Sequence, residues 1–549
     1  MAHPILARLQ ARGSQGQAVD ALASIFLVAL TGAYAVVAVD FSVAPYEDAA
    51  ILMRYAKHLA DGLGIVWNVD GGPVDGATDF LFLIVLAGLA RAGLSIELAT
   101  RLCASLAHVA TVLAVYFALR RVGRAGVLAA SVPAAYLAVG PGLRYVAAYF
   151  GTPFFALFAL LSWIAVLQVE RGGGEHRWAP AFAVSSLITG LIRPEGVILS
   201  ALMLLALVCL RGPRAAMPAL RWYFAVHALL GGAYFAWRWS YFGYPLPNPF
   251  YVKGGGQLYW DSLRESLRGT LGMGLPFLPA FVAALRTPAL ARRALGYAIP
   301  VAGFACAFVL LSNAMNLGAR FQYAGLPILA VSWYPLVRDL PAELGLDRLA
   351  RIDFHWRRAL VALGLVAALG IVAYGHSFSR HIRYYRDGRY DVARALHAYR
   401  DLGYTLATTE AGLLPFYSEW RTVDTAGLND SWIAHHGGVT EEYLDRFHPE
   451  LIVFHEYFSP LTGVLARDDD RFRMIRTLLS YVERHGYLLA ASFGVSPYDT
   501  HYYYVRPGFA HEAALLRDIR ATSYHWHETG RRALDFAAAC RSDTRGSRD

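Results

Sequence analysis

Long apolar runs recur along this chain, and they limit its possible folds more than any other feature does. About eleven of these runs approach the 17 to 25 residues that a helix needs to cross a membrane. They lie at 20–40, 99–119, 124–140, 148–168, 178–192, 195–211, 219–240, 269–286, 293–311, 319–336 and 357–374. The chain is also 56% hydrophobic and 17% charged, whereas a soluble domain is about 45–50% apolar and about 25% charged. The sequence therefore predicts an α-helical polytopic membrane protein.

One further apolar run, 79–93, decides the predicted topology. If it crossed the membrane, the basic loops at 120–124, 211–214 and 286–293 would lie outside, whereas the positive-inside rule places such loops in the cytoplasm. We therefore expect 79–93 to dip into the interface without crossing. The net charge of +9 is then explained by basic residues in the cytoplasmic loops, and it does not indicate a surface that binds nucleic acid. With the N-terminus inside, the chain after about residue 375 is expected outside the plasma membrane.

The composition becomes polar and charged after about residue 375. Short β-like runs and a helix-like stretch alternate there, at 449–456, 487–494, 501–507 and 390–403. This pattern is typical of a small α/β domain. The predicted domains are a transmembrane catalytic domain, 1–374, with a first outer loop at 41–98, and an extracytoplasmic soluble α/β domain, 375–549.

Two adjacent carboxylates, Glu47 and Asp48, directly follow the first predicted membrane helix. Apolar residues then recur at helical spacing from Ile51 to Leu59, which predicts an interfacial amphipathic helix. Acidic side chains favour a helix N-terminus electrostatically, and this alone would explain the pair. The functional alternative is that one carboxylate is a general base, because ionisable groups at the membrane edge are costly and usually serve a function.

The stretch EDAAILMRYAKHLADGLGIVWNVDGGPVDGATDFL (47–81) resembles the first outer loop of GT-C glycosyltransferases that use polyprenyl-phosphate sugars. It is most similar to the loop of the mycobacterial arabinofuranosyltransferase B type. The matching residues are Asp48, Ala49, Arg54, Tyr55, Ala56, Gly62, Gly64, Val66, Trp67, Asn68, Asp75, Gly76 and Thr78. The resemblance implies the GT-C fold. It agrees with the active face outside the cytoplasm that the topology predicts, and the apolar runs predict about eleven transmembrane helices for this fold.

The resemblance continues in patches along the chain, in the order that the family uses. These patches are GLIRPEG (190–196), YFGYPLPNPFYVK (241–253), ARFQYAGLPIL (319–329) and TEAGLLPFYSEWRTVDTAGLNDSWIA (409–434). The chain also departs from the pattern. Glu47 stands where the family has Asp, Ala77 follows Asp75-Gly76, and the middle-helix motif at 149–155 has no acid. These departures bear on the sugar and the acceptor more than on the reaction class.

The resemblance also implies roles for individual residues. The catalytic base is Asp48, which keeps the family's residue type, or Glu47. Cations must stand beside the donor phosphate because charge builds on the leaving polyprenyl phosphate, and the candidates are Lys253, Arg193, Arg320, Arg54 and His58. The candidate substrate contacts are Asn68, Trp67, Asp75, Asp79, Asn248 and Tyr251. Carboxylate oxygens suit hard cations, so a divalent metal is a further candidate, held by Asp48, Asp75 and Asp79.

Several of these cations also have a simpler explanation. Arg193 and Arg320 could snorkel from helix ends, which is the commoner fate of such residues. His58 is more simply explained as facing the membrane interface. Lys253 is a stronger candidate, because the Pro and Asn residues around it favour a defined loop.

The predicted function is that of an inverting membrane glycosyltransferase, which moves a sugar from a polyprenyl-phosphate donor to a hydroxyl of a cell-envelope glycan, lipid or protein. Arabinofuranose is the sugar nearest the family match, and mannose, aminoarabinose or another pentose would use the same parts. No glycine-rich phosphate loop supports a nucleotide-sugar site. The alternative is a non-enzymatic transporter or lipid-binding protein. A transporter should show inverted repeats and charges at mid-membrane depth, which the sequence does not clearly show.

Overall fold

The computed structural model describes most of the chain, in two compact units. The described residues are 3–172, 174–254, 258–312, 316–343, 354–380, 385–456, 470–496 and 499–538. The helical unit comprises Met1–Asp40, Thr100–Phe235 and Gly256–Arg383, and the mixed unit comprises Phe41–Ala99, Ala236–Gly255 and Tyr384–Asp549. The predicted limits, 1–374 and 375–549, assign the first outer loop to the membrane domain, whereas in the structure that loop groups with the C-terminal part of the chain.

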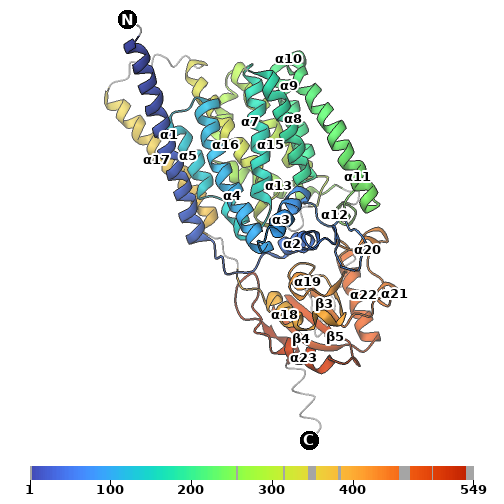
Figure 1. Ribbon diagram of the computed structural model, residues 1–549. Coiled ribbons are helices and arrows are strands. Elements are labelled where there is room, and N and C mark those ends of the chain that lie inside the picture. The colour runs from blue at the N-terminus through green and yellow to red at the C-terminus, as the bar shows by residue number, and fades with distance from the viewer. Residues whose placement is uncertain are drawn as a thin grey trace. The chain divides into compact units, whose positions relative to one another are not determined.

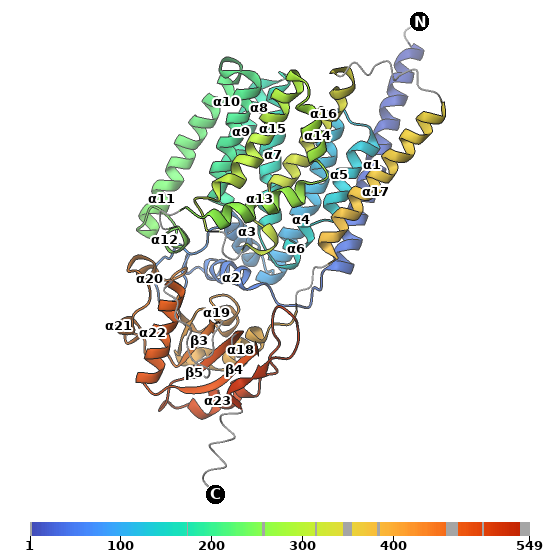
Figure 2. The same ribbon diagram turned by 180° about the vertical axis from the view of Figure 1, so that it is seen from behind.

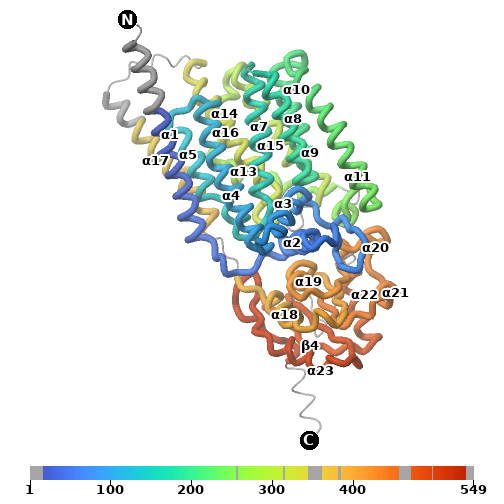
Figure 3. Tube along the Cα trace, in the orientation of Figure 1, coloured from blue at the N-terminus to red at the C-terminus, as the bar shows by residue number. Residues whose placement is uncertain are grey.

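Helices make up the helical unit, as expected where a backbone in hydrocarbon must satisfy its own polar groups. They are α1 (His3–Ala38), α4 (Ile96–Phe117), α5 (Val127–Ala138), α6 (Gly142–Ala147), α7 (Thr152–Glu170), α8 (Glu175–Ile192), α9 (Glu195–Arg211), α10 (Pro213–Val226), α13 (Trp260–Gly274), α14 (Leu278–Ala284), α15 (Pro288–Ala307), α16 (Gly325–Glu343) and α17 (Phe354–Ser379). Two short π-helices, η1 (Ala118–Gly123) and η2 (His227–Gly231), and one 3-10 helix, η3 (Leu317–Ala319), also belong to it. In this unit α7 packs against α8 and α9, and α15 packs against α9 and α16. Figure 1 shows these helices as ribbons, and Figure 3 shows them as a tube in the same orientation.

Five helices in the described part of the chain are long and apolar enough to cross a membrane. They are Gly16–Ala38, Ile96–Gly123, Val127–Ala147, Thr152–Glu170 and Val361–Ser379, and the pair α13 and α14, bent by 93°, makes a sixth if counted as one span. The other predicted runs also lie largely on helices. α9 has 17 residues, α8 contains Pro180, and α15 contains Arg292 and Arg293. The structure confirms a polytopic helical architecture, while the count of eleven stays a prediction.

The doubtful run at 79–93 forms α3 (Phe80–Arg91), which has 12 residues. A helix of this length extends about 18 Å at 1.5 Å per residue. The hydrocarbon core of a bilayer is about 30 Å thick, so α3 by itself is too short to cross it.

A six-stranded sheet forms the centre of the mixed unit, in the order β2-β1-β3-β5-β4-β6. The strands are β1 (Thr405–Thr408), β2 (Arg421–Asp424), β3 (Leu451–Glu456), β4 (Leu488–Ser496), β5 (Asp499–Val505) and β6 (Leu534–Asp535). β1 pairs in parallel with β2 and β3, while β5 and β4 run antiparallel to their neighbours. β3, β4 and β5 lie side by side in Figure 1 and Figure 2. The three predicted β-like runs coincide with these three strands.

Alternation along the strands sends apolar side chains into two cores, one on each face of the sheet. In β3, Leu451 and Val453 join one core, and Ile452 and Phe454 join the other. The first core is covered by α18 (Gly388–Leu396) and α23 (Glu512–Arg520), and the second by α22 (Asp470–Arg484), α20 (Ser431–His435) and α21 (Glu441–Leu444). Helices therefore cover both faces, which confirms the predicted α/β domain.

The first outer loop adds further helices to the mixed unit. These are α2 (Glu47–Ala60) and α3. The separate segment 236–255 contributes the second half of α11 (Gly232–Phe242) and α12 (Asn248–Lys253). The helix α19 (Leu413–Ser418) packs against α2. Two glycines permit close approach between the loop and the sheet domain. A Cβ on Gly412 would lie 1.9 Å from the Glu47 carbonyl oxygen, and a Cβ on Gly76 would lie 2.3 Å from Asn429 Oδ1.

Candidate functional site

The two carboxylates in the first turn of α2 have different surroundings. Glu47 is buried, and its oxygens accept hydrogen bonds from the backbone N–H groups of Gly412 and Leu413. The guanidinium of Arg389 lies 3.5 Å from the same carboxylate. Asp48, by contrast, is half-buried. Glu47 therefore anchors α2 to the segment before α19, and Asp48 is the more accessible acid of the pair.

Arg389 is the centre of a buried charge cluster. Its guanidinium pairs with Asp387, at 2.7 Å, and with Glu410 and Glu47. Burial raises the pKa of Glu47, and Arg389 offsets that effect only in part. Burial also acts to raise the pKa of Glu410, but Arg389 outweighs it and holds that pKa below its usual range. Three carboxylates thus surround one guanidinium, and Asp387 also caps α18 by accepting from the Arg389 N–H.

Arg54 is fully enclosed by hydrogen-bond acceptors of the mixed unit. It donates to the carbonyls of Trp67, at 2.8 Å, and Trp420, at 2.9 Å, and also to the Pro415 carbonyl and Asn68 Oδ1. A planar guanidinium suits such a set of acceptors. Through these hydrogen bonds, Arg54 connects the first outer loop to the sheet domain.

His58, Trp67 and Asn68 also make internal hydrogen bonds. His58 Nδ1 lies 2.9 Å from the Val66 carbonyl, and burial lowers the His58 pKa to about 4, so the ring is neutral at pH 7. Asn68 exchanges two 2.9 Å hydrogen bonds with the backbone of Thr422, and the Trp67 indole donates to the same carbonyl. The predicted substrate contacts Trp67 and Asn68 therefore hold the first outer loop on β2.

Asp75 and Asn248 join the first outer loop to α12. The Asn248 N–H donates to the Asp75 carbonyl at 3.0 Å, and the Asp75 carboxylate pairs with Arg238 of α11. The Asn248 side chain donates to Ser431 Oγ at 3.3 Å. Asp79 is buried at the start of α3. Within the described residues, Asp48, Asp75 and Asp79 do not converge into a three-ligand metal group.

Aromatic rings gather near the other end of α12. The His435 ring stacks on Tyr244 with centroids 3.6 Å apart and lies 4.3 Å from the ring of Tyr251. Lys253 is the last residue of α12 and is partly exposed. The predicted residues Tyr251 and Lys253 thus share one short helix.

In the helical unit, the predicted cations Arg193 and Arg320 come together on one aromatic ring. Their guanidinium carbons lie 5.0 Å and 4.9 Å from the centroid of Phe321, and Arg320 also lies 4.2 Å from the ring of Phe150. Arg193 is 3.3 Å from Glu195. Cation–π contacts orient a guanidinium plane while keeping its charge. Arg193 and Arg320 are 127 positions apart in sequence, yet both contact the same ring. The sequence motifs did not predict this contact.

Strained backbone accompanies these arginines. Tyr149, whose ring lies 4.6 Å from Arg101, has φ of 63°, and Ala319, directly before Arg320, has φ of 61°. Non-glycine residues in this region cost about 1 to 3 kcal/mol and cluster at functional sites. A Cβ on the neighbouring Gly318 would lie 2.6 Å from Arg144 Nη1, so Arg144 lies against the same loop.

Sequence reasoning did not single out several of these residues. They are Arg101, Arg144, Tyr149, Arg238, Arg389, Glu410 and His435. Arg389 lies at the start of α18, and Glu410 lies just after β1. The sequence around them does not distinguish these buried charges from charges on the surface. The usable signal was Gly412 in TEAGLLP, because a glycine between a strand and a helix often marks a close approach.

Comparisons with known proteins bear on the fold. A family model described as a domain of unknown function (DUF8728) matches residues 380–507. No curated protein matches the chain.

Solved structures match over most of the chain's length. ArnT from Cupriavidus metallidurans, bound to undecaprenyl phosphate, matches with a TM-score of 0.55 and 16% identity over 87% of this chain and 97% of that one. Its apo state gives a TM-score of 0.52 and 17% identity over the same shares. The apo oligosaccharyltransferase from Archaeoglobus fulgidus matches with a TM-score of 0.51 and 12% identity over 89% of this chain and 74% of that one. The chain therefore has the GT-C fold.

Proposed function

We propose that this protein is an inverting membrane glycosyltransferase that takes its sugar from a polyprenyl-phosphate donor. The observation that carries the proposal is the match of the GT-C fold along 97% of a protein solved with undecaprenyl phosphate. Two features of the chain itself add support. They are the accessible carboxylate at the start of α2 and the arginine pair on Phe321.

Arg193 and Arg320 of the helical unit are the proposed contacts of the donor phosphate. Lys253, at the end of α12, is a separate candidate that the sequence suggests. As the sugar leaves, negative charge builds on the phosphate, and fixed cations stabilise it. Arginines offer planar N–H edges for phosphate oxygens, and a lysine offers a mobile point charge. The internal hydrogen bonds of Arg54 and the neutral state of His58 favour a structural role for these two residues over direct contact with the phosphate.

Asp48 is the proposed general base. It takes the proton of the acceptor hydroxyl while that oxygen bonds to the anomeric carbon and the bond to the phosphate oxygen breaks. The products are the glycosidic bond, with inverted configuration, and the polyprenyl phosphate. Glu47 is the weaker candidate, because it is buried against Gly412, Leu413 and Arg389, whereas Asp48 is half-buried.

The finer assignment concerns the sugar, the acceptor and the side of the membrane. Arabinofuranose is proposed as the sugar from the resemblance of the first outer loop, and a cell-envelope glycan outside the plasma membrane as the acceptor. Mannose, aminoarabinose or another pentose would need the same base and cations, so the donor assay has to include them.

The test is transfer by the full chain in lipid vesicles, with separate polyprenyl-phosphoryl donors carrying each of these sugars. We expect the wild type to turn over one donor, and Asp48→Asn to reduce the rate by about 10² to 10⁴, the usual contribution of a general base. Asp61→Asn is the matched control, because Asp61 is an exposed acid at the C-terminal end of the same helix, paired at 3.8 Å with Lys57.

Two results would count against the proposal. Full activity in both Asp48→Asn and Glu47→Gln would remove the base assignment. Donor binding without any product, for every sugar and acceptor offered, would instead favour the alternative of a non-enzymatic lipid-binding or transport protein.

A further inference from the structure

Two histidines face each other across neighbouring strands of the mixed unit. His455 of β3 and His501 of β5 are direct register partners in an antiparallel pair. Side chains of directly opposed residues lie on the same face of a sheet, with Cβ atoms about 4.5 to 5.5 Å apart. Their rings have centroids 4.4 Å apart. The strand register therefore brings the two imidazoles together.

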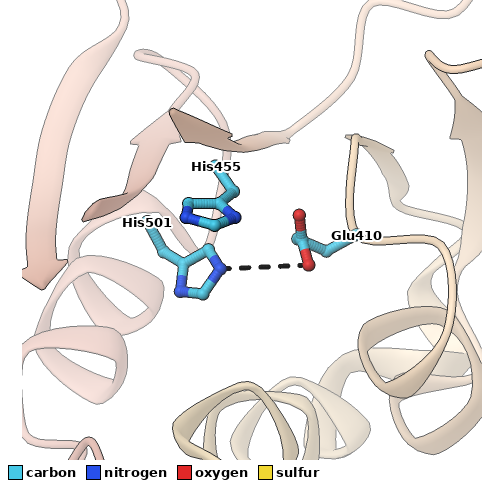
Figure 4. Close-up of side chains that lie close together, drawn as sticks. All are labelled: Glu410, His455 and His501. Atoms are coloured by element: carbon cyan, nitrogen blue, oxygen red, sulfur yellow. Dashed lines mark ion pairs between the residues drawn. The ribbon is translucent and has the colours of Figure 1, made fainter. Parts of the chain in front are cut away.

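Glu410 completes the group from a third part of the chain, two residues after β1. The backbone N–H of His455 donates to Thr409 Oγ1 at 3.0 Å, and this hydrogen bond holds the turn against the end of β3. Figure 4 shows the Glu410 carboxylate directed toward the two rings, with His501 Nε2 lying 3.9 Å from Glu410 Oε2. One ligand atom from each of the three residues lies within 4.8 Å of the others, and all three residues are buried.

One nitrogen of each imidazole has a hydrogen-bond partner that orients the ring. His455 Nε2 lies 2.8 Å from Asp499 Oδ1, and His501 Nδ1 lies 2.8 Å from the Tyr524 hydroxyl. Metal-binding histidines usually have such a partner on the second nitrogen, which sets the tautomer and the ring orientation. The remaining nitrogen of His501, Nε2, is fully buried and directed toward Glu410, and it has no hydrogen-bond partner among the described residues.

The charges around the group favour a cation. Glu410 belongs to the cluster in which Asp387 and Glu47 also surround Arg389, so three buried carboxylates share one guanidinium. Asp499 adds a fourth carboxylate behind His455. Arg389 and Arg471 offset part of this charge, and Arg471 donates to the His455 carbonyl at 3.0 Å. Burying a carboxylate is costly unless cations offset its charge, and an ion bound by Glu410 adds to that offset.

We propose that Glu410, His455 and His501 form a binding site for a Zn²⁺-type divalent metal ion. Two imidazole nitrogens and one carboxylate oxygen are a ligand set that zinc accepts in four-coordinate sites. Metal–ligand bonds of about 2.0 to 2.2 Å need ligand atoms about 3.5 Å apart, so the group closes by about 1 Å onto the ion. The His527 ring lies 5.9 Å from that of His501, so the fourth position falls to His527 or to water.

The proposed metal has a structural role. It ties the turn after β1 to β3 and β5, and it fixes Glu410, which pairs with Arg389 beside the α2 anchor Glu47. This role is separate from the transfer reaction, and its test needs no donor or acceptor.

The experiment measures metal content and stability of the full chain in detergent, purified with a tag that contains no histidine. After removal of metals with a chelator and addition of ZnCl₂, mass spectrometry of the elements should find about one zinc per chain in the wild type. X-ray absorption at the zinc edge should show two imidazoles and an oxygen ligand. Zinc should also raise the Tm of the wild type.

Matched variants identify the site. His501→Ala and His455→Ala should lose the bound zinc and the zinc-dependent rise in Tm, while His525→Ala should keep both, because His525 lies outside the group and bonds the Ser523 carbonyl. The proposal fails if the wild type binds no stoichiometric zinc, or if His501→Ala binds as much as the wild type. Should a variant not fold, the absorption spectrum of the wild type decides, and a spectrum without imidazole ligands overturns the proposal.

Discussion

Arginines of the two units are held in different ways. In the helical unit, Arg193 and Arg320 lie over aromatic rings, with the shared Phe321 between them. In the mixed unit, Arg389 is surrounded by carboxylates and Arg54 by carbonyls. A ring orients a guanidinium and leaves its positive charge in place, whereas carboxylates neutralise it. Arg193 also pairs with Glu195 at 3.3 Å, so the contrast lies in the main contacts of each set. Aromatic rings contact Arg193 and Arg320, whereas oxygen acceptors surround Arg389 and Arg54.

The largest expected effect is on stability, from the loss of Arg389. Arg389→Ala leaves Asp387, Glu47 and Glu410 buried without their cation, and breaking such a buried group typically costs about 3 to 5 kcal/mol. The matched control is Arg386→Ala, whose exposed pair with Asp391 should contribute at most about 1 kcal/mol. Thermal unfolding of both variants gives the comparison, and equal losses would contradict the distinction.

A smaller loss of stability is expected for Arg54→Lys. An ammonium cannot reach the four acceptors that the planar guanidinium serves, and each buried acceptor left without a donor costs about 1 to 3 kcal/mol. Lys57→Ala on the same helix is the control, since Lys57 makes only half-exposed ion pairs. If Arg54→Lys lowered the transfer rate without lowering Tm, Arg54 would belong with the ligand-binding arginines after all.

For the helical unit, the expected effect is on activity. Arg320→Ala should reduce transfer by about 10- to 100-fold, because a hydrogen bond to a charged group contributes about 1.5 to 3 kcal/mol. The Tm should stay near that of the wild type. Arg214→Ala, which changes an exposed arginine at the start of α10, should leave the rate unchanged. A drop in Tm as large as that of Arg389→Ala would make Arg320 a structural residue.

The smallest effect is a pH dependence in the mixed unit. Burial raises the pKa of Asp424 to about 6, despite hydrogen bonds from Asn429. The folded state then keeps this proton where the unfolded state has lost it, so the contribution of Asp424 to stability falls as pH rises from about 4 to about 6. The Tm of the wild type relative to Asp424→Asn should fall across that range, and a constant difference would show that the carboxyl is ionised throughout.

Much of the architecture could be predicted from local sequence patterns. Apolar runs and basic loops predicted a polytopic helical protein, and period-two runs predicted β3, β4 and β5. The short strands β1 and β2, with four residues each, were not predicted, because four residues are too few to show a period. The site was predicted only as a set of residue types, since motifs specify which groups are present and not which of them are already paired.

By itself, the sequence determined that this chain is a membrane protein with a polar α/β domain and an acidic pair after its first helix. Those properties depend on residues near one another in the chain, where hydrophobicity and periodicity act locally. Only the tertiary structure decided that Glu47 is an anchor and Asp48 the accessible acid, and that Arg193 meets Arg320. It also brought Glu410, His455 and His501 together. Burial and charge pairing depend on segments that are far apart in sequence, so no local pattern could have distinguished these residues.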